Sequence, residues 1–147
     1  MLTFEGDQDF SQPPDEVWSK LTNPAFLVQC IPDVESVARQ GPDEAVFSLR
    51  PGFSFVRGTL QVNLKVVETN KPVSARLHAY SKGIGTSSDV EASLEFAPHN
   101  GGTRVHWIAE VKQLGGLLKA VPQGLIKASA QKVIADIWSE IAANFQI

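Results

Sequence analysis

Apolar and polar residues alternate along most of the chain up to residue 111, which is the pattern of half-buried β-strands. The clearest example is FVRGTLQVNLKVVE (55–68), where Leu60, Val62 and Leu64 share one parity and polar residues hold the other. Such alternation predicts one packed face and one wet face, as in antiparallel sheets. We predict seven strands in all, at 2–10, 34–40, 44–50, 55–68, 73–80, 88–96 and 103–111.

The linkers between these segments are short and rich in turn residues, so consecutive strands should form hairpins. Examples are GPDE (41–44), KGIG (82–85) and PHNGG (98–102). The alternation is least regular at 34–40 and 44–50, where a one-residue bulge would swap the inward and outward side chains. On the last three strands we expect these side chains to point inward: Val73, Ala75, Leu77, Ala79, Val90, Ala92, Leu94, Phe96, Val105, Trp107, Ala109 and Val111.

Two short segments after the first strand follow a helical period instead. In the segment 13–22, Pro14 suits a first helical turn, and Asp15 and Glu16 suit its positive end. A second short helix is predicted over 24–31, which ends at a Pro-Asp pair.

The segment 114–145 follows the three-and-four spacing of an amphipathic helix. Pro122 and Gly124 interrupt it, so the helix is either kinked near residue 122 or begins there with Pro122 in its first turn. A helix of this length must bury its apolar stripe, and the sheet offers the surface for it. The stripe consists of Leu118, Val121, Leu125, Ile126, Ser129, Val133, Ile137 and Ile141.

These elements together predict an α+β helix-grip fold in a single domain, 1–147. A curved antiparallel sheet of seven strands would wrap around the long C-terminal helix, and two short helices would follow the first strand. This architecture tends to leave an apolar cavity at its mouth, and such cavities hold apolar ligands.

Composition and charge narrow the function classes. The 147 residues are 43% hydrophobic, and the net charge of −3 comes without any run of basic residues, so we expect no nucleic-acid partner. The acidic N-terminus does not resemble a signal peptide, and no apolar run is long enough for a transmembrane segment. A single cysteine excludes an intrachain disulfide, so we expect a cytoplasmic protein.

Few residues in the sequence suggest catalysis or metal binding. Cys30 lies on the apolar face of a short predicted helix with no histidine near it in sequence, which favours a buried structural cysteine over a nucleophile. His78 and His106 alternate with inward residues, so both should face outward, and His99 lies in a turn. This spacing does not fit a metal site, and we expect neither a metal nor a cofactor.

Two further patterns have ordinary explanations. The glycine-rich KGIG resembles a phosphate loop, but such a loop must open a helix, and the segment after it alternates as a strand. We therefore interpret it as a hairpin turn or a bulge. Glu91, Glu95 and Glu110 fall on the wet face of the sheet, so they do not form an acid-base pair in the interior.

Four spaced segments also carry a family resemblance: 13–37, 50–62, 81–96 and 101–116. In this order they resemble the carbon monoxide dehydrogenase G-subunit family, which belongs to the superfamily of START, polyketide cyclase and Bet v 1-like domains. Asp33 departs from the family pattern, which usually has glycine there, and Val34 stands where a second cysteine is common. The sequence ends without the hydrophobic tail of some relatives, so we do not expect direct membrane anchoring, and peripheral membrane contact stays open.

The resemblance implies a helix-grip domain whose relatives are associated with molybdenum-containing carbon monoxide dehydrogenase, and a superfamily whose pockets bind lipids and other lipophilic molecules. Three hypotheses follow. The leading one is a non-enzymatic carrier of a lipid or quinone-like molecule in an apolar pocket. The second is a surface-acting assembly or recruitment factor for a molybdenum hydroxylase. The third is a cyclase-like or hydrolase-like enzyme that uses the same pocket.

The aromatic residues either fill the space between helix and sheet or line a cavity. In the second case the loop RPGFSF (50–55) would be a gate, and Pro122 with Gly124 the opposing lip. Ser81 and Tyr80 are further polar groups that could orient a ligand, although alternation places Tyr80 outward. The residues expected to line the pocket are Trp18, Phe26, Phe47, Phe53, Phe55, Leu60, Leu77, Leu94, Trp107, Leu118, Val121, Leu125 and Ser129.

Overall fold

One antiparallel sheet of seven strands forms the framework of the molecule, in a computed structural model that describes residues 2–51 and 58–145. The strand order is β1-β7-β6-β5-β4-β3-β2, so β1 and β2 are the edges. The strands are β1 (Leu2–Phe10), β2 (Val34–Gln40), β3 (Glu44–Leu49), β4 (Leu60–Asn70), β5 (Ser74–Gly83), β6 (Thr86–His99) and β7 (Gly102–Gly116). The helices are α1 (Pro14–Leu21), α2 (Pro24–Cys30), the 3₁₀ turn η1 (Leu117–Ala120) and α3 (Gln123–Phe145).

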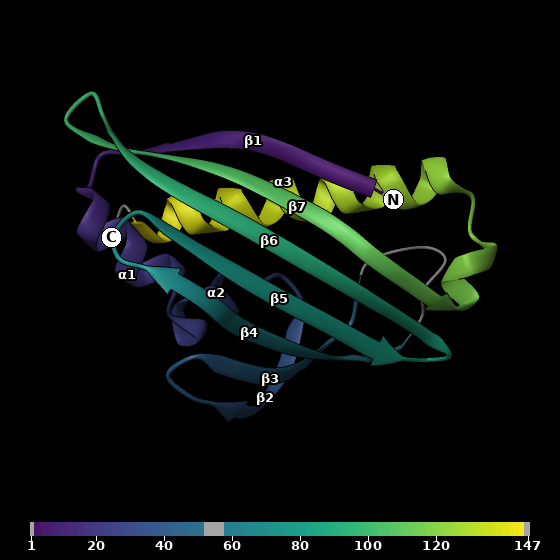
Figure 1. The fold of residues 1–147 in the computed structure, drawn as a ribbon. Coiled ribbons are helices and arrows are strands. Elements are labelled where there is room, and N and C mark those ends of the chain that lie inside the picture. The colour runs from purple at the N-terminus through teal and green to yellow at the C-terminus, as the bar shows by residue number, and fades with distance from the viewer. Residues whose placement is uncertain (1, 52–57, 146–147) are drawn as a thin grey trace.

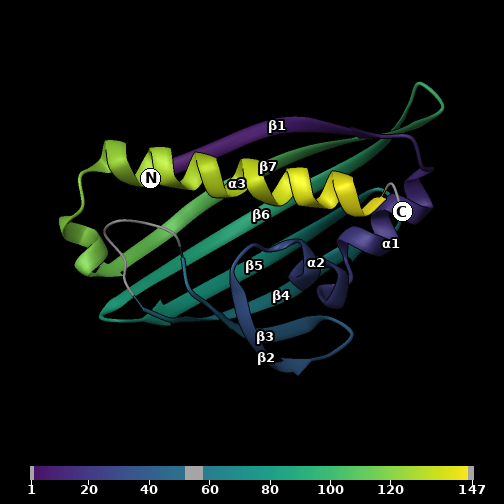
Figure 2. The ribbon, with the colours of Figure 1, turned by 180° about the vertical axis from the view of Figure 1, so that it is seen from behind.

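The long helix α3 lies across one face of the curved sheet, and the opposite face is open to solvent (Figures 1 and 2). The short helices α1 and α2 lie at the same end of the sheet as the C-terminus of α3. This arrangement is the helix-grip fold that the sequence predicts, so the predicted fold class is confirmed. We call the face under α3 the inner face.

The predicted C-terminal helix begins only after Pro122. The Pro122 carbonyl accepts hydrogen bonds from the backbone N–H groups of Leu125 and Ile126, at 3.0 and 3.2 Å, as a residue just before a first turn does. Of the two alternatives for this segment, a helix start near residue 122 is therefore correct and a kink there is wrong, although Pro122 precedes the first turn and does not lie in it. Leu118 and Val121, which the sequence places on the helical stripe, lie outside α3 in η1 and the connection that follows it.

Several strand boundaries differ from the sequence prediction. The paired strands extend beyond the residues in which apolar and polar side chains alternate. Strand β7 runs to Gly116, and a bulge at Lys112 changes which parity faces inward beyond it. Val73 does not point into the core: it lies in the β4–β5 turn and is 53% exposed. The first residues of the predicted strand 55–68 lie outside the described residues.

The edge strand β2 is as irregular as the sequence suggests. Its pairing with β3 shifts register between Val34 and Ser36 and again between Val37 and Arg39. By contrast, β1 pairs with β7 in one unbroken register from Leu2 to Phe10.

The C-terminal end of α3 packs into the core at the end of the sheet that carries α1 and α2. The largest fully buried side chains include Phe47, Leu21, Val17 and Val105. At this end the ring of Phe145, from the last turn of α3, lies 4.6 Å from the ring of Phe10. The fold thus fixes α3 firmly at its C-terminal end.

We predict that Phe47→Ala destabilises the protein by about 3–5 kcal/mol, because the truncation leaves a cavity in a fully packed site. Urea unfolding followed by circular dichroism measures the change. Val37→Ala on the exposed side of β2 is the matched control and should change stability by less than about 0.5 kcal/mol. Equal effects of the two substitutions would contradict this description of the core.

Candidate functional site

A groove of about 640 Å³ lies between the edge strand β1 and the helix α3. Its apolar lining comes from Phe4, Trp107, Ile134 and Trp138, together with the exposed Ala135. Polar and charged side chains form the rim, namely Thr3, Glu5, Asp7, Gln8, Lys127, Gln131 and Ser139. An apolar hollow with a few polar groups at its edge is the usual character of a small-molecule site.

Strand register positions the aromatic floor. Gly6 of β1 pairs with Trp107 of β7, and a Cβ atom at residue 6 would lie only 2.9 Å from the Trp107 indole. The glycine therefore leaves room for the indole to extend across β1. The ring of Trp107 lies 5.9 Å from that of Trp138 on α3, with an angle of 31° between their planes. These two rings join the sheet to the helix at the base of the groove.

A smaller hollow of about 390 Å³ lies where β7, η1 and the first turn of α3 meet. Its apolar lining includes Leu2, Leu114, Leu118, Val121 and Ile126. Lys119 adds positive charge at its rim, whereas Lys112, also part of the lining, is paired with Glu91 and Glu110.

The inner face of β5 and β6 is only partly covered. The cross-strand pairs Leu77–Ala92 and Ala79–Val90 lie at the centre of the sheet, yet all four side chains are half-buried. The next pair along is polar: the hydroxyls of Ser81 and Ser88 lie 2.5 Å apart, within hydrogen-bond distance. Apolar side chains of central strands under a helix are ordinarily buried, so the space beneath α3 is incompletely filled.

The predicted pocket residues separate into distinct groups. Trp107 lines the larger groove, and Leu118 with Val121 lines the smaller hollow. Phe47 and Leu94 are buried in the core.

The remaining predicted residues lie elsewhere. The indole N–H of Trp18 donates to the Ser74 carbonyl at 3.0 Å, and Phe26 packs edge-on against Phe145, so both fasten helices to the core. Leu60, Leu77 and Ser129 are half-buried, whereas Leu125 is 42% exposed and does not belong to a buried stripe. Phe53 and Phe55 lie outside the described residues, as does most of the loop expected to be a gate. Tyr80 is exposed, as its parity predicts.

Sequence reasoning missed the groove residues Ile134 and Trp138 on α3. Both belong to a second face of the helix, which also carries the polar Lys127 and Gln131. The sequence prediction assumed a single apolar stripe and therefore did not include this face. An aromatic residue four positions after an isoleucine, on a face with long polar side chains, is the signal that could have identified it.

Cys30 has the surroundings of a structural cysteine. Its side chain is fully buried, and burial raises the pKa of the thiol to about 11. The carboxylate of Glu140 raises the pKa further, while the Asn144 amide, which donates to the sulfur at 3.7 Å, opposes the rise. A thiol in this state is neutral at physiological pH and does not attack electrophiles.

We predict that native protein at about pH 8 reacts with iodoacetamide at least about a hundredfold more slowly than protein unfolded in urea, because only the thiolate reacts. Mass spectrometry of the alkylated chain over time gives both rates at the single cysteine. Comparable rates would show that Cys30 is accessible and ionised.

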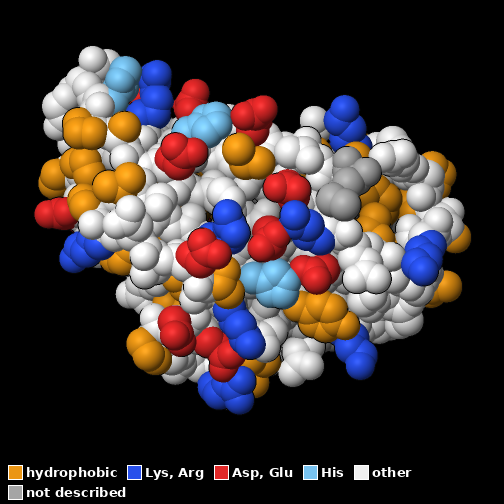
Figure 3. All heavy atoms as spheres, in the orientation of Figure 1, with side chains coloured by type: hydrophobic (Ala, Val, Ile, Leu, Met, Phe, Trp, Pro, Cys, Tyr) orange, Lys and Arg blue, Asp and Glu red, His pale blue; other side chains and the backbone are white. Residues whose placement is uncertain are grey.

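The outer face of the sheet carries interleaved acidic, basic and histidine side chains (Figure 3). Glu91 and Glu110 both lie 3.2 Å from Lys112, and His78 forms a short contact with Asp89. His78 and His106 lie on the outer face, as predicted, whereas His99, expected in a turn, is the last residue of β6 and pairs with Gly102. Over residues 2–51 and 58–145, histidine, cysteine and carboxylate side chains form no group of three that could hold a metal ion.

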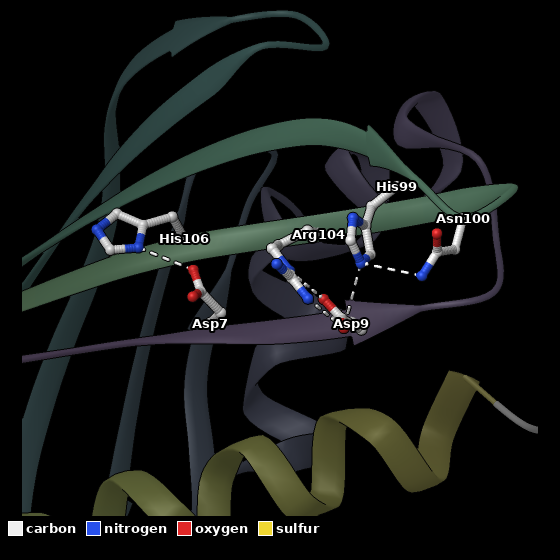
Figure 4. Close-up of polar contacts among 6 residues, drawn as sticks. All are labelled: Asp7, Asp9, His99, Asn100, Arg104 and His106. Carbon is white, nitrogen blue, oxygen red and sulfur yellow. Dashed lines mark hydrogen bonds and ion pairs between the residues drawn. The ribbon is translucent and has the colours of Figure 1, made fainter.

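The β1–β7 part of this face holds a row of ion pairs (Figure 4). His106 Nδ1 lies 2.9 Å from Asp7 and its Nε2 lies 3.4 Å from Glu5, while the Arg104 Nε donates to Asp9 at 2.8 Å. The hydrogen bond to Asp7 raises the pKa of His106, and the hydrogen bond from Arg104 lowers the pKa of Asp9.

His106 should therefore stabilise the protein in mildly acidic solution. Because its pKa is raised on folding, the contribution is complete below the ordinary histidine pKa of about 6.5 and is lost as the pH rises through the folded-state value. We predict that His106→Gln lowers the unfolding free energy more at about pH 5.5 than at about pH 8.5. Urea titrations at the two pH values test this, and in an Asp7→Asn background the difference should shrink. A pH-independent effect of the substitution would contradict the assignment.

Comparisons with known proteins agree with the fold. The family model described as the G subunit of carbon monoxide dehydrogenase (CoxG) matches residues 6–146. A conserved protein from Geobacillus kaustophilus has a similar solved structure, with a TM-score of 0.86 at 24% identity, covering 99% of this chain and 95% of that one. A Mycobacterium smegmatis protein has a TM-score of 0.68 at 14% identity, covering 99% and 91% of the two chains. None of the curated proteins matches the sequence.

These structural likenesses show a shared fold. Asp33 adopts φ = 66°, a left-handed conformation that aspartate tolerates better than most residues. Over the described parts of the chain, α3 and the other helices are too short or too polar to cross a membrane.

Proposed function

Because this chain belongs to the carbon monoxide dehydrogenase G-subunit (CoxG) family, with a START/Bet v 1-like fold, we propose that it is a non-enzymatic cytoplasmic protein that binds one lipophilic small molecule, a lipid or a quinone-like compound. The binding site in this proposal is the groove between β1 and α3. The observation that supports it most is the aromatic floor of Trp107 and Trp138 beneath an open groove of about 640 Å³.

The size of the groove suits such a ligand. Small-molecule sites in proteins commonly enclose about 300–1,000 Å³, and this groove lies within that range. Its floor offers rings and aliphatic groups for an apolar body. Lys127, Gln131 and Ser139 on the α3 side of the rim offer hydrogen-bond donors for a polar head group.

The incompletely covered inner face extends this surface. Leu77, Ala79, Val90 and Ala92 are apolar and only half-buried, so an apolar chain that passed beneath α3 would remove them from water. Removing apolar surface from water contributes roughly 25 cal/mol per Å². In this proposal a ring or head group occupies the groove and an aliphatic tail extends below the helix.

The residues that line the groove suit a binding function better than a catalytic one. Its titratable lining residues are Glu5, Asp7 and Lys127, and Asp7 is already held by His106 on the outer face. Cys30 is buried in the core with a raised pKa. An enzyme of the cyclase or hydrolase type would need a positioned acid or base that reaches the ligand.

A second candidate function is association with a molybdenum-containing redox enzyme, as an assembly or recruitment factor. The observation that favours it is the matching family model, whose description names carbon monoxide dehydrogenase. The two functions are compatible, since a carrier of a quinone-like molecule would deliver it to such an enzyme. Co-purification of this protein with a molybdenum hydroxylase from its host would support the second candidate, and a monomeric preparation that retains a lipophilic ligand would favour the first alone.

We predict that decyl-ubiquinone quenches tryptophan fluorescence of the protein saturably, because a quinone in the groove lies against Trp107 and Trp138. Ala135→Phe fills the groove and should weaken the affinity at least about tenfold. Ala143→Phe is the matched control, since it adds the same ring to an exposed alanine two turns further along α3 and outside the groove.

Oleate displaces the quinone if the groove accepts apolar chains in general. Quenching that does not saturate, or that both variants weaken equally, would show that this groove is not the site.

A further inference from the structure

The two edges of the sheet differ in how well they are protected against pairing with another strand. Edge strands expose unpaired backbone N–H and C=O groups, and proteins usually block them with bulges, lysine or proline. Strand β2 shifts register twice against β3 and carries the charged Glu35 and Arg39. Strand β1 has no such feature: its nine residues pair with β7 in one unbroken register and include neither lysine nor proline. One side of β1 is therefore a regular strand edge.

The backbone on that side of β1 has no partner among the residues that the structure describes. Strand β1 pairs with β7 alone, and residues 3–8 make no other backbone–backbone hydrogen bond within the described parts of the chain. In an antiparallel strand every second residue directs both its N–H and its C=O to the same side. Residues 3–8 thus present about three such pairs of groups, at intervals of about 7 Å.

The groove of about 640 Å³ follows this unpaired side of β1. Its wall on β1 includes Thr3, Phe4, Glu5, Asp7 and Gln8. Neighbouring residues of a strand point to opposite faces of the sheet, so a groove that touches both sets must run along the edge of the strand. Figures 1 and 2 show α3 beside this edge. The unpaired backbone groups of β1 consequently belong to the groove wall opposite the helix.

The outer-face side chains beside these backbone groups are acidic. Glu5, Asp7 and Asp9 alternate along β1, and each of these side chains is at least half exposed. Arg104 and His106 of β7 neutralise part of the charge from the side away from the groove. A strand that paired with β1 would place its own outer side chains about 5 Å from these carboxylates. Basic side chains at those positions would complement the charge of β1.

The inner side chains of such a strand would meet an apolar surface. Phe4, Trp107, Ile134 and Trp138 line the groove below the level of the acidic residues. Apolar side chains at every second position would cover these residues and remove them from water. Residues 3–8 span about 20 Å, which matches a segment of about six extended residues.

We infer that β1 accepts an extended segment of a partner protein, about six residues long, in which basic and apolar side chains alternate. The segment adds an eighth strand to the sheet: its backbone pairs with β1, and its side chains give specificity. A second copy of this chain does not fit. Antiparallel pairing of two β1 strands about Gly6 would put Glu5 opposite Asp7 of the other copy, and like charges in that position are destabilising.

Strand addition goes beyond the proposed ligand binding and also affects it. A docked segment and a quinone-like molecule would both lie against Trp107 and Trp138, so they exclude each other. A partner that supplies the segment would thereby release the bound molecule. This consequence rests on the proposed function, whereas strand addition itself does not.

The test uses the full chain and a fluorescein-labelled peptide of three Lys-Val repeats. Fluorescence anisotropy should show saturable binding that weakens as salt is raised. The control peptide has the same side chains but N-methylated backbone amides, so it has no N–H groups to donate to a strand edge. It should bind at least about tenfold more weakly. Hydrogen-exchange mass spectrometry should show slower exchange over residues 2–10 with the unmethylated peptide only.

Substitutions on both walls of the groove locate the binding site. Glu5→Lys should weaken peptide binding about tenfold, because an attractive cross-strand pair becomes a repulsive one. Glu68→Lys reverses the same charge at an exposed position on β4 and should change binding less than about twofold. Ala135→Phe narrows the groove and should weaken binding at least about tenfold, whereas Ala143→Phe, outside the groove, should not.

Three results would overturn the inference: no binding of the peptide, equal binding of its N-methylated form, or unchanged exchange over residues 2–10. A dimer of the protein in sedimentation velocity, with residues 2–10 protected in the absence of peptide, would overturn the choice of a partner protein as occupant. Decyl-ubiquinone quenching without peptide tests the carrier separately. Peptide binding by protein that does not bind quinone would support strand addition and contradict the proposed function.

Discussion

The attachment of α3 at its C-terminal end determines which part of the molecule is closely packed and which part stays open. There the ring of Phe145 lies 4.6 Å from Phe10 and 5.5 Å from Phe26, and its carbonyl accepts a hydrogen bond from the Gln12 side chain at 2.9 Å. Lys20 adds a cation above the same ring at 4.8 Å. Strand β1, both short helices and the end of α3 thus converge on one residue, and the fully packed core surrounds this junction.

A helix fixed mainly at one end leaves its other half less closely packed. Only Ile126, Ile141 and Phe145 of α3 are buried, and the two hollows lie along β1 and around the first turn of the helix. Packing the whole helix tightly would stabilise the fold further, at roughly 25 cal/mol for each Å² of apolar surface buried. An open, apolar region of this kind beside a rigid core is what a carrier of a lipophilic molecule requires.

The sequence alone predicts the sheet and both short helices, because alternation in β4, β5 and β6 is clean and the prolines mark where helices begin. It also predicts that Cys30 is buried on the apolar face of a short helix, as the structure shows. It could not locate the groove, which depends on a register contact between Gly6 and Trp107, about a hundred residues apart, and on the mixed face of α3 that carries Trp138. The bulge at Lys112 likewise has no local signal.

The central claim is that this open region holds a lipophilic molecule in the cell. Native mass spectrometry of protein purified from its own host, followed by solvent extraction of whatever is bound, tests it most directly. We expect one lipophilic compound per chain, which is released on unfolding. Protein that is detected without a bound ligand, under conditions in which a lipid-binding control retains its own, would contradict the claim.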